Sequence, residues 1–184
     1  MLFRQKYDKI RDMKQPYLEC GKIINTHGVR GTLKLESYCD SPKILAKLTR
    51  VFFKTANESY TERKVRSASV GKGVVLANLE GIESLDDAIL YKGKTVYALR
   101  EDIPLKKGAF FMADLIGLPL IDAESGRRYG TVKDVESMPS SDMYTVSLPS
   151  GSEILFPAVK EFVKEIRLEE GIFITPIEGF FEEE

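Results

Sequence analysis

Short runs with strand-like patterns, separated by turn residues, most restrict the folds open to this chain of 184 residues. In the clearest run, Leu33 and Leu35 alternate with Thr32, Lys34 and Glu36, which is the period-two pattern of a strand with one buried face. Further strand-like runs before residue 100 cover residues 17–24, 50–54, 60–70, 73–79 and 94–99. Six short strands with turn residues between them predict a closed or nearly closed antiparallel barrel.

One helix interrupts these runs, in the segment 84–93. Ser84 can cap its first turn, where Asp86 and Asp87 add negative charge that favours the helix dipole. Gly93 is a typical stop signal at its end. The pattern therefore predicts a short helix within the first barrel domain.

A second set of strand-like runs follows the polar segment 101–108, which contains Pro and Gly and is predicted to be a linker. These runs cover residues 118–122, 128–137, 143–148, 152–156 and 171–176. Residues 159–166 carry the four-residue spacing of a helix, and we expect a short helical turn that leads into a strand. Residues 109–184 are therefore predicted to form a second small β-barrel.

The predicted fold class is all-β, with two small antiparallel β-barrels in tandem. The first barrel covers residues 17–100 and the second covers residues 109–184. Residues 1–16 carry five basic and two acidic side chains, and we expect them to form a mobile basic extension.

The composition is that of a folded, water-soluble protein, with 43% hydrophobic and 30% charged residues. No run approaches the roughly 18 apolar residues that a membrane span needs, and the charged first residues differ from a signal peptide. Cys20 and Cys39 could form one bridge at most, which is too few for a disulfide scaffold. We therefore expect a cytoplasmic protein that does not contact membranes.

The net charge of −1 hides a strong asymmetry between the two halves of the chain. Residues 1–100 hold 19 Lys and Arg against 11 Asp and Glu, whereas residues 101–184 hold 8 against 17. A basic half could face nucleic acid while an acidic half faces a basic partner. An uneven distribution of solvated side chains explains the same numbers.

Catalytic and metal-binding patterns are nearly absent from the sequence. His27 is the single histidine, and its spacing from Cys20 and Cys39 differs from that of structural zinc motifs. A small hydrolase that uses His27 with Asp40 or Cys39 is a second hypothesis, although no oxyanion hole or nucleophile elbow is recognisable. We expect neither a metal nor a cofactor.

The segment between the first two strand-like runs is rich in glycine and carries basic side chains. Gly21, Gly28 and Gly31 predict a structural turn that needs positive φ or a close backbone approach. Arg30 within this turn would present a guanidinium suited to phosphate, beside His27. A structural hairpin with a solvated Arg30 fits the spacing equally well.

This glycine-rich segment opens a pattern that resembles the RimM family, the bacterial maturation factors of the small ribosomal subunit. Its matching positions are Gly21, Ile23, His27, Gly28, Gly31, Leu33, Lys34 and Leu35. The segments 79–98, 110–122, 130–135, 153–159 and 178–180, together with Asp142, resemble the rest of the family pattern in order. The order and spacing of these motifs from residue 17 to residue 181 make the resemblance specific.

The resemblance implies a barrel like those of translation factors, followed by a PRC-type barrel. It also implies a monomer without catalytic activity that binds the immature small ribosomal subunit at its head and assists its assembly and rRNA processing. The implied partners are ribosomal RNA and a head ribosomal protein, number nineteen of the small-subunit series. We expect Arg30, Lys34 and His27 to contact the rRNA.

Bulky side chains just after the linker are expected to bind the protein partner. Phe110, Phe111 and Met112 are adjacent, so they cannot all point into one small barrel, and at least one should be exposed or covered by the other domain. Asp114, with Asp122 and Glu124, would form a polar rim opposite a basic protein. Packing of both phenylalanines in the domain core is the competing interpretation.

The chain departs from the family pattern at two phenylalanines, and one further alternative function remains to be compared. Phe110 and Phe111 stand where the family usually has paired tyrosines, so a phenolic hydrogen bond is lost and the apolar anchor remains. A PRC-barrel adaptor for a non-ribosomal partner is a further alternative, and the glycine-histidine segment of the first barrel weighs against it.

Overall fold

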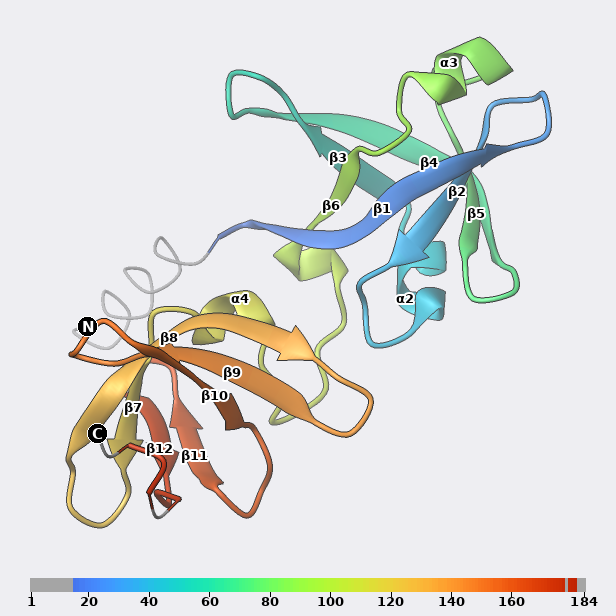
Figure 1. The fold of residues 1–184 in the computed structure, drawn as a ribbon. Coiled ribbons are helices and arrows are strands. Elements are labelled where there is room, and N and C mark those ends of the chain that lie inside the picture. Colours follow the sequence, from blue (N-terminus) through green and yellow to red (C-terminus); the bar gives the residue numbers. More distant parts are fainter. Residues whose placement is uncertain (1–14, 178, 182–184) are drawn as a thin grey trace, which may run out of the picture. The chain divides into compact units, whose positions relative to one another are not determined.

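Six strands in the first part of the chain close into a barrel, in the order β1-β2-β5-β4-β3-β6 with antiparallel pairing throughout (Figure 1). The strands are β1 (Tyr17–His27), β2 (Thr32–Ser37), β3 (Arg50–Lys54), β4 (Tyr60–Val70), β5 (Val75–Leu79) and β6 (Thr95–Leu99). The computed structural model describes residues 15–177 and 179–181, so most of the expected N-terminal extension lies outside the described residues. The predicted strand positions in this part of the chain are confirmed to within a few residues.

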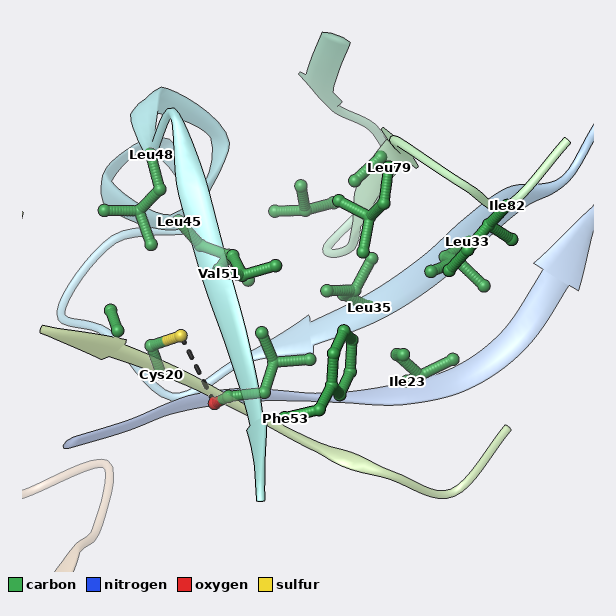
Figure 2. Close-up of a cluster of buried hydrophobic side chains, with 14 of the residues drawn as sticks. Cys20, Ile23, Leu33, Leu35, Leu45, Leu48, Val51, Phe53, Leu79 and Ile82 are labelled. Atoms are coloured by element: carbon green, nitrogen blue, oxygen red, sulfur yellow. Dashed lines mark hydrogen bonds between the residues drawn. The ribbon is translucent and has the colours of Figure 1, made fainter. Parts of the chain in front are cut away.

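The chain divides into two compact units, residues 1–104 and residues 105–184, each with its own hydrophobic core. In unit 1 the alternating pattern of β2 is confirmed, because Leu33 and Leu35 point into the barrel together with Ile23 and Leu79 (Figure 2). Cys20 is part of this core and its thiol donates a hydrogen bond to the Val96 carbonyl oxygen at 3.3 Å. Both cysteines are free thiols.

The predicted helix is present as α3 (Leu85–Ile89), preceded by its cap. The Ser84 hydroxyl accepts a hydrogen bond from the Asp87 backbone N–H at 3.1 Å, and the Asp87 carboxylate accepts one from the Ser84 backbone N–H at 3.1 Å. This reciprocal pair satisfies two N–H groups that a helix start otherwise leaves unpaired. The Ser84 hydroxyl also donates to the Asp87 carboxylate at 2.7 Å, and this hydrogen bond, together with those from the Glu83 and Ser84 backbone N–H groups, lowers the pKa of Asp87.

A second helix of unit 1, α2 (Pro42–Lys47), was not among the predicted elements. Ser41 caps it and Pro42 occupies its first turn, which are ordinary start signals. Leu45 is the residue that α2 buries in the barrel core. The helix is too short for its hydrophobic periodicity to be visible in the sequence.

Unit 1 ends in a short 3-10 helix, η1 (Arg100–Asp102), that is tied to β3. Arg50 donates to Asp102 at 2.8 Å and to Glu101 at 3.0 Å. The first four residues of the predicted linker, 101–104, therefore belong to unit 1, and the first two of them lie in η1.

Unit 2 is a six-stranded sheet in the order β10-β9-β8-β7-β12-β11. Its elements are α4 (Met112–Leu115), β7 (Pro119–Asp122), β8 (Arg128–Ser137), β9 (Asp142–Ser147), β10 (Glu153–Pro157), β11 (Val163–Arg167) and β12 (Gly171–Ile174). The all-β fold class is confirmed, with one difference from a purely antiparallel arrangement: β7 and β12 pair in parallel. The crossover that a parallel pair needs is supplied by β8 to β11.

The segment with mixed signals, residues 159–166, is a helical turn followed by a strand, as expected. The Val163 backbone N–H donates to the Val159 carbonyl oxygen at 2.8 Å, and β11 begins at Val163 itself. Phe162 of this turn packs against the core of unit 2.

Candidate functional site

The β1–β2 turn, residues 28–31, projects from unit 1 directly after His27, the last residue of β1. Gly28 and Gly31 both have positive φ, +67° and +74°, as the sequence predicts for a turn. A Cβ built on Gly31 would lie 2.4 Å from the Ile82 carbonyl oxygen. The turn is therefore held against the segment that leads into α3, and only glycine fits at this contact.

Gly21 lies inside β1, paired with Ser37 of β2 and Val96 of β6, so its predicted place in the turn was wrong. A Cβ there would lie 2.4 Å from the Glu36 carbonyl oxygen. The glycine is required by the close approach of two strands at a bulge of the barrel rather than by positive φ.

The tip of the turn presents exposed basic and apolar side chains. His27 and Arg30 are exposed, Val29 is 74% exposed, and Lys34 is half-buried on β2 opposite Asn25. Within the described part of the chain, none of the three basic side chains makes an ion pair or a side-chain hydrogen bond. Their hydrogen-bond donors are free to meet an anionic ligand.

Some other basic side chains of unit 1 are already neutralised by carboxylates. Arg66 donates to Glu83 at 2.7 Å and Lys54 pairs with Glu58 at 2.9 Å. Unlike these residues, Arg30 and Lys34 are not occupied by a carboxylate and are available to contact a phosphate group.

The residues of the hydrolase hypothesis are not brought together. The Cys39 Sγ lies 3.7 Å from the Cys20 carbonyl oxygen, and His27 is seven residues further along β1, about 20 Å away at the strand rise of ~3.3 Å per residue. Asp40 follows Cys39 at the same end of the strand. Burial also raises the pKa of the Cys39 thiol, which opposes thiolate formation.

The described residues contain neither a metal-binding cluster nor a membrane-spanning helix. Within residues 15–177 and 179–181, no group of three or more His, Cys, Asp or Glu side chains could hold a metal ion. In the same residues, no helix is long and apolar enough to cross a membrane.

The predicted protein-binding residues divide between the core and the surface of unit 2. Phe110 packs against the core, Phe111 is half-buried, and Met112 is 39% exposed at the start of α4. Asp114 is half-buried, and its backbone N–H donates to the Phe111 carbonyl oxygen at 2.9 Å. Met112 is therefore the side chain of this segment that offers apolar surface.

Asp122 is not part of a polar rim, contrary to expectation, because it is only 8% exposed. Its carboxylate accepts hydrogen bonds from the Ser125 hydroxyl at 2.6 Å and the Glu124 backbone N–H at 2.9 Å. These hydrogen bonds lower its pKa and fix the β7–β8 turn.

A second pair of basic side chains without carboxylate partners was missed by sequence reasoning. Arg63 of β4 and Lys94, just before β6, both contact Tyr91. Arg63 lies in a run of charged residues that looks like a solvated strand face. Its one distinguishing signal is that it shares a face of β4 with Val65, which packs against the core.

Comparison with known proteins places both units in one family. The RimM N-terminal domain matches residues 18–103, and the RimM PRC barrel domain matches residues 112–177. A relative named ribosome maturation factor RimM, from Clostridium botulinum (strain Hall), is 38% identical over 88% of this chain and 95% of its own length. A protein of the same name from Staphylococcus aureus (strain Newman) is 31% identical over 90% of this chain and 99% of its own length.

One solved structure with similarity to both units is a putative 16S ribosomal RNA processing protein RimM from Pseudomonas aeruginosa. It is 22% identical, with 88% of this chain and 98% of that chain covered and a TM-score of 0.45. The two domain matches and the identity to curated relatives extend over most of the sequence. The chain belongs to the RimM family.

Proposed function

We propose that this protein assists maturation of the small ribosomal subunit, including processing of its 16S rRNA, by binding the immature subunit without catalysing a reaction. Membership of the RimM family over both units is the observation that carries this proposal. The process is the one for which the relatives and the similar structure are named. The separation of His27 from Cys39 and Asp40 along β1 supports a binding role.

Within this role, unit 1 contacts rRNA and unit 2 contacts a head ribosomal protein of the subunit. The charge asymmetry of the sequence supports the division, since basic side chains meet RNA phosphates and acidic ones meet a basic protein. The RNA contact uses the β1–β2 turn through Arg30, His27 and Lys34. The protein contact uses Met112 and the segment from Phe110 to Asp114.

Cosedimentation with purified precursor subunits tests the proposal as a whole. The full-length protein should sediment with immature small subunits and should not bind mature large subunits. A PRC-barrel adaptor for a non-ribosomal partner would remain in the supernatant with both, and that result would reject the proposed function.

The Arg30→Ala variant should bind precursor subunits with a weaker dependence on salt. Removal of one phosphate contact reduces the slope of log K against log salt by roughly 0.7 to 0.9. Lys54→Ala removes the same formal charge, but Lys54 is already paired with Glu58. The salt slope of Lys54→Ala should therefore equal that of the unmodified protein. If Arg30→Ala shows this same slope as well, Arg30 is not part of the RNA-binding surface.

The Met112→Ala variant should keep its stability but bind the precursor subunit roughly tenfold more weakly, a loss of about 1.4 kcal/mol that is typical of an interface anchor. Met138→Ala is the matched control, because Met138 is also in unit 2 and is 44% exposed. Equal affinities for the two variants would place the protein contact elsewhere on unit 2.

A further inference from the structure

The groups that contact Arg63 are neutral and do not balance its positive charge. Its Nη2 lies 3.5 Å from the Tyr91 hydroxyl, and its Nη1 donates to the Glu62 backbone carbonyl at 3.1 Å. Its Nε is buried and has no hydrogen-bond partner. Among the residues that the structure describes, no carboxylate forms an ion pair with it.

Lys94 approaches the same tyrosine from another direction. Its ammonium nitrogen lies 4.4 Å from the centre of the Tyr91 ring, and its side chain is exposed. The ring itself is fixed by an edge contact with Phe53, at 5.0 Å between ring centres. Lys94, like Arg63, has no carboxylate partner in the described ranges. Two positive charges are therefore gathered around one rigid ring.

The buried Nε of Arg63, which has no acceptor, costs free energy of folding and therefore needs an explanation. Like charges repel, and a buried N–H without an acceptor loses its hydration without compensation. A bound ion is one arrangement that accounts for an unsatisfied buried polar group of this kind. An oxyanion is the ligand that such a cluster suits, because guanidinium and ammonium groups are the usual phosphate-binding side chains and a tyrosine hydroxyl can donate to a phosphate oxygen.

The cluster lies at the same end of the barrel as the β1–β2 turn. Gly31 of the turn approaches Ile82 and Glu83 immediately before α3, and Tyr91 follows α3. The Ile23 backbone N–H donates to the Lys94 carbonyl oxygen at 3.0 Å, and His27 is four residues further along β1, roughly 13 Å away.

We propose that Arg63, Tyr91 and Lys94 form a second phosphate-binding site, which holds the backbone of the same RNA strand that the β1–β2 turn contacts. The inference rests on the proposed function and deepens it, because two separate phosphate contacts fix the direction of the strand across the α3 end of unit 1. Positioning of this kind needs no base contact, so the site is indifferent to sequence.

The test compares two full-length double variants of equal charge change. Arg63→Gln with Lys94→Gln should reduce the slope of log K against log salt by about 1.4 for a 12-nucleotide single-stranded RNA, which is two contacts at ~0.7 each. Lys64→Gln with Lys92→Gln removes two exposed lysines next to the cluster, and its slope should stay that of the unmodified protein. The same ranking is expected with precursor subunits.

Thermal melting separates binding from folding. The Arg63→Gln, Lys94→Gln variant should melt at the same temperature as the unmodified protein or higher, because a half-buried cation without a carboxylate partner has been removed. If the double variant melts at a lower temperature, the single variant Lys94→Gln is tested instead, because the Lys94 side chain is exposed. The slope of log K against log salt for this single variant should fall by about 0.7.

The outcomes distinguish this site from the proposed function. A slope unchanged in the Arg63 and Lys94 variants, with the slope of Arg30→Ala reduced, overturns the second site and leaves the proposed function standing. Absence of binding to precursor subunits by the unmodified protein rejects the proposed function instead. Titration with inorganic phosphate, followed by the Tyr91 and Lys94 amide signals in NMR spectra, tests whether the bound anion is free phosphate or RNA. If free phosphate saturates the site while the variants keep the salt slope of the unmodified protein for RNA, the site binds a free anion and the proposal is overturned.

Discussion

Replacement of Gly31 by alanine should destabilise unit 1 by about 3 kcal/mol. Positive φ costs a residue with a Cβ roughly 1–2 kcal/mol, and overpacking adds a similar amount. Here the new Cβ would lie 2.4 Å from the Ile82 carbonyl oxygen, which is backbone and cannot rotate away as a flexible side chain would. Urea unfolding of the full-length protein measures the change.

Gly28→Ala is the matched control for this prediction. Gly28 has nearly the same φ, +67° against +74°, but a Cβ there meets nothing within 4 Å. It should therefore cost only the conformational part, about 1 kcal/mol. Equal losses for the two variants would mean that the turn is not held against the segment before α3.

The alternation of apolar and polar residues was sufficient to predict most strands of both units. The pattern works because side chains on a strand alternate between faces and one face must be buried. It says which face is inside but not which strand is the neighbour. The parallel pairing of β7 with β12 depends on contacts such as Leu120 beside Ile172, which are far apart in sequence.

The candidate site was predicted in its residue types and only partly in its geometry. Gly28 and Gly31 are in the expected turn, whereas Gly21 serves a strand crossing, because a glycine in sequence looks the same whether it is needed for positive φ or for space. Similarly, Phe110 and Met112 lie two residues apart and are both bulky and apolar, and only the packing assigns the first to the core and the second to the surface.

The cluster around Tyr91 could not be predicted for a related reason. A charged residue in a strand with many charges is expected to face solvent, and Arg63 is distinguished only by the loss of partners that the fold imposes on it. Tertiary structure thus decides which basic side chains are neutralised and which remain available to a ligand.

The largest loss of stability is expected from Phe156→Ala, at about 3–5 kcal/mol, because a large side chain is removed from a closed core. Phe156 is fully buried on β10 and contacts the rings of Phe162 and Phe181, with 6.2 and 5.9 Å between ring centres. Its neighbour Leu155 points away from the core and is 51% exposed, so Leu155→Ala should cost less than about 1 kcal/mol.

The same variant tests whether the two units fold independently, as their separate cores and the predicted linker suggest. Because Phe156 belongs to the core of unit 2, differential scanning calorimetry of Phe156→Ala should show that unit melting early while the transition of unit 1 stays in place. NMR signals of buried residues such as Leu33 and Val146 would assign the two transitions. A single transition that shifts as a whole would contradict two domains, and binding of RNA by unit 1 could then not be measured apart from the stability of unit 2.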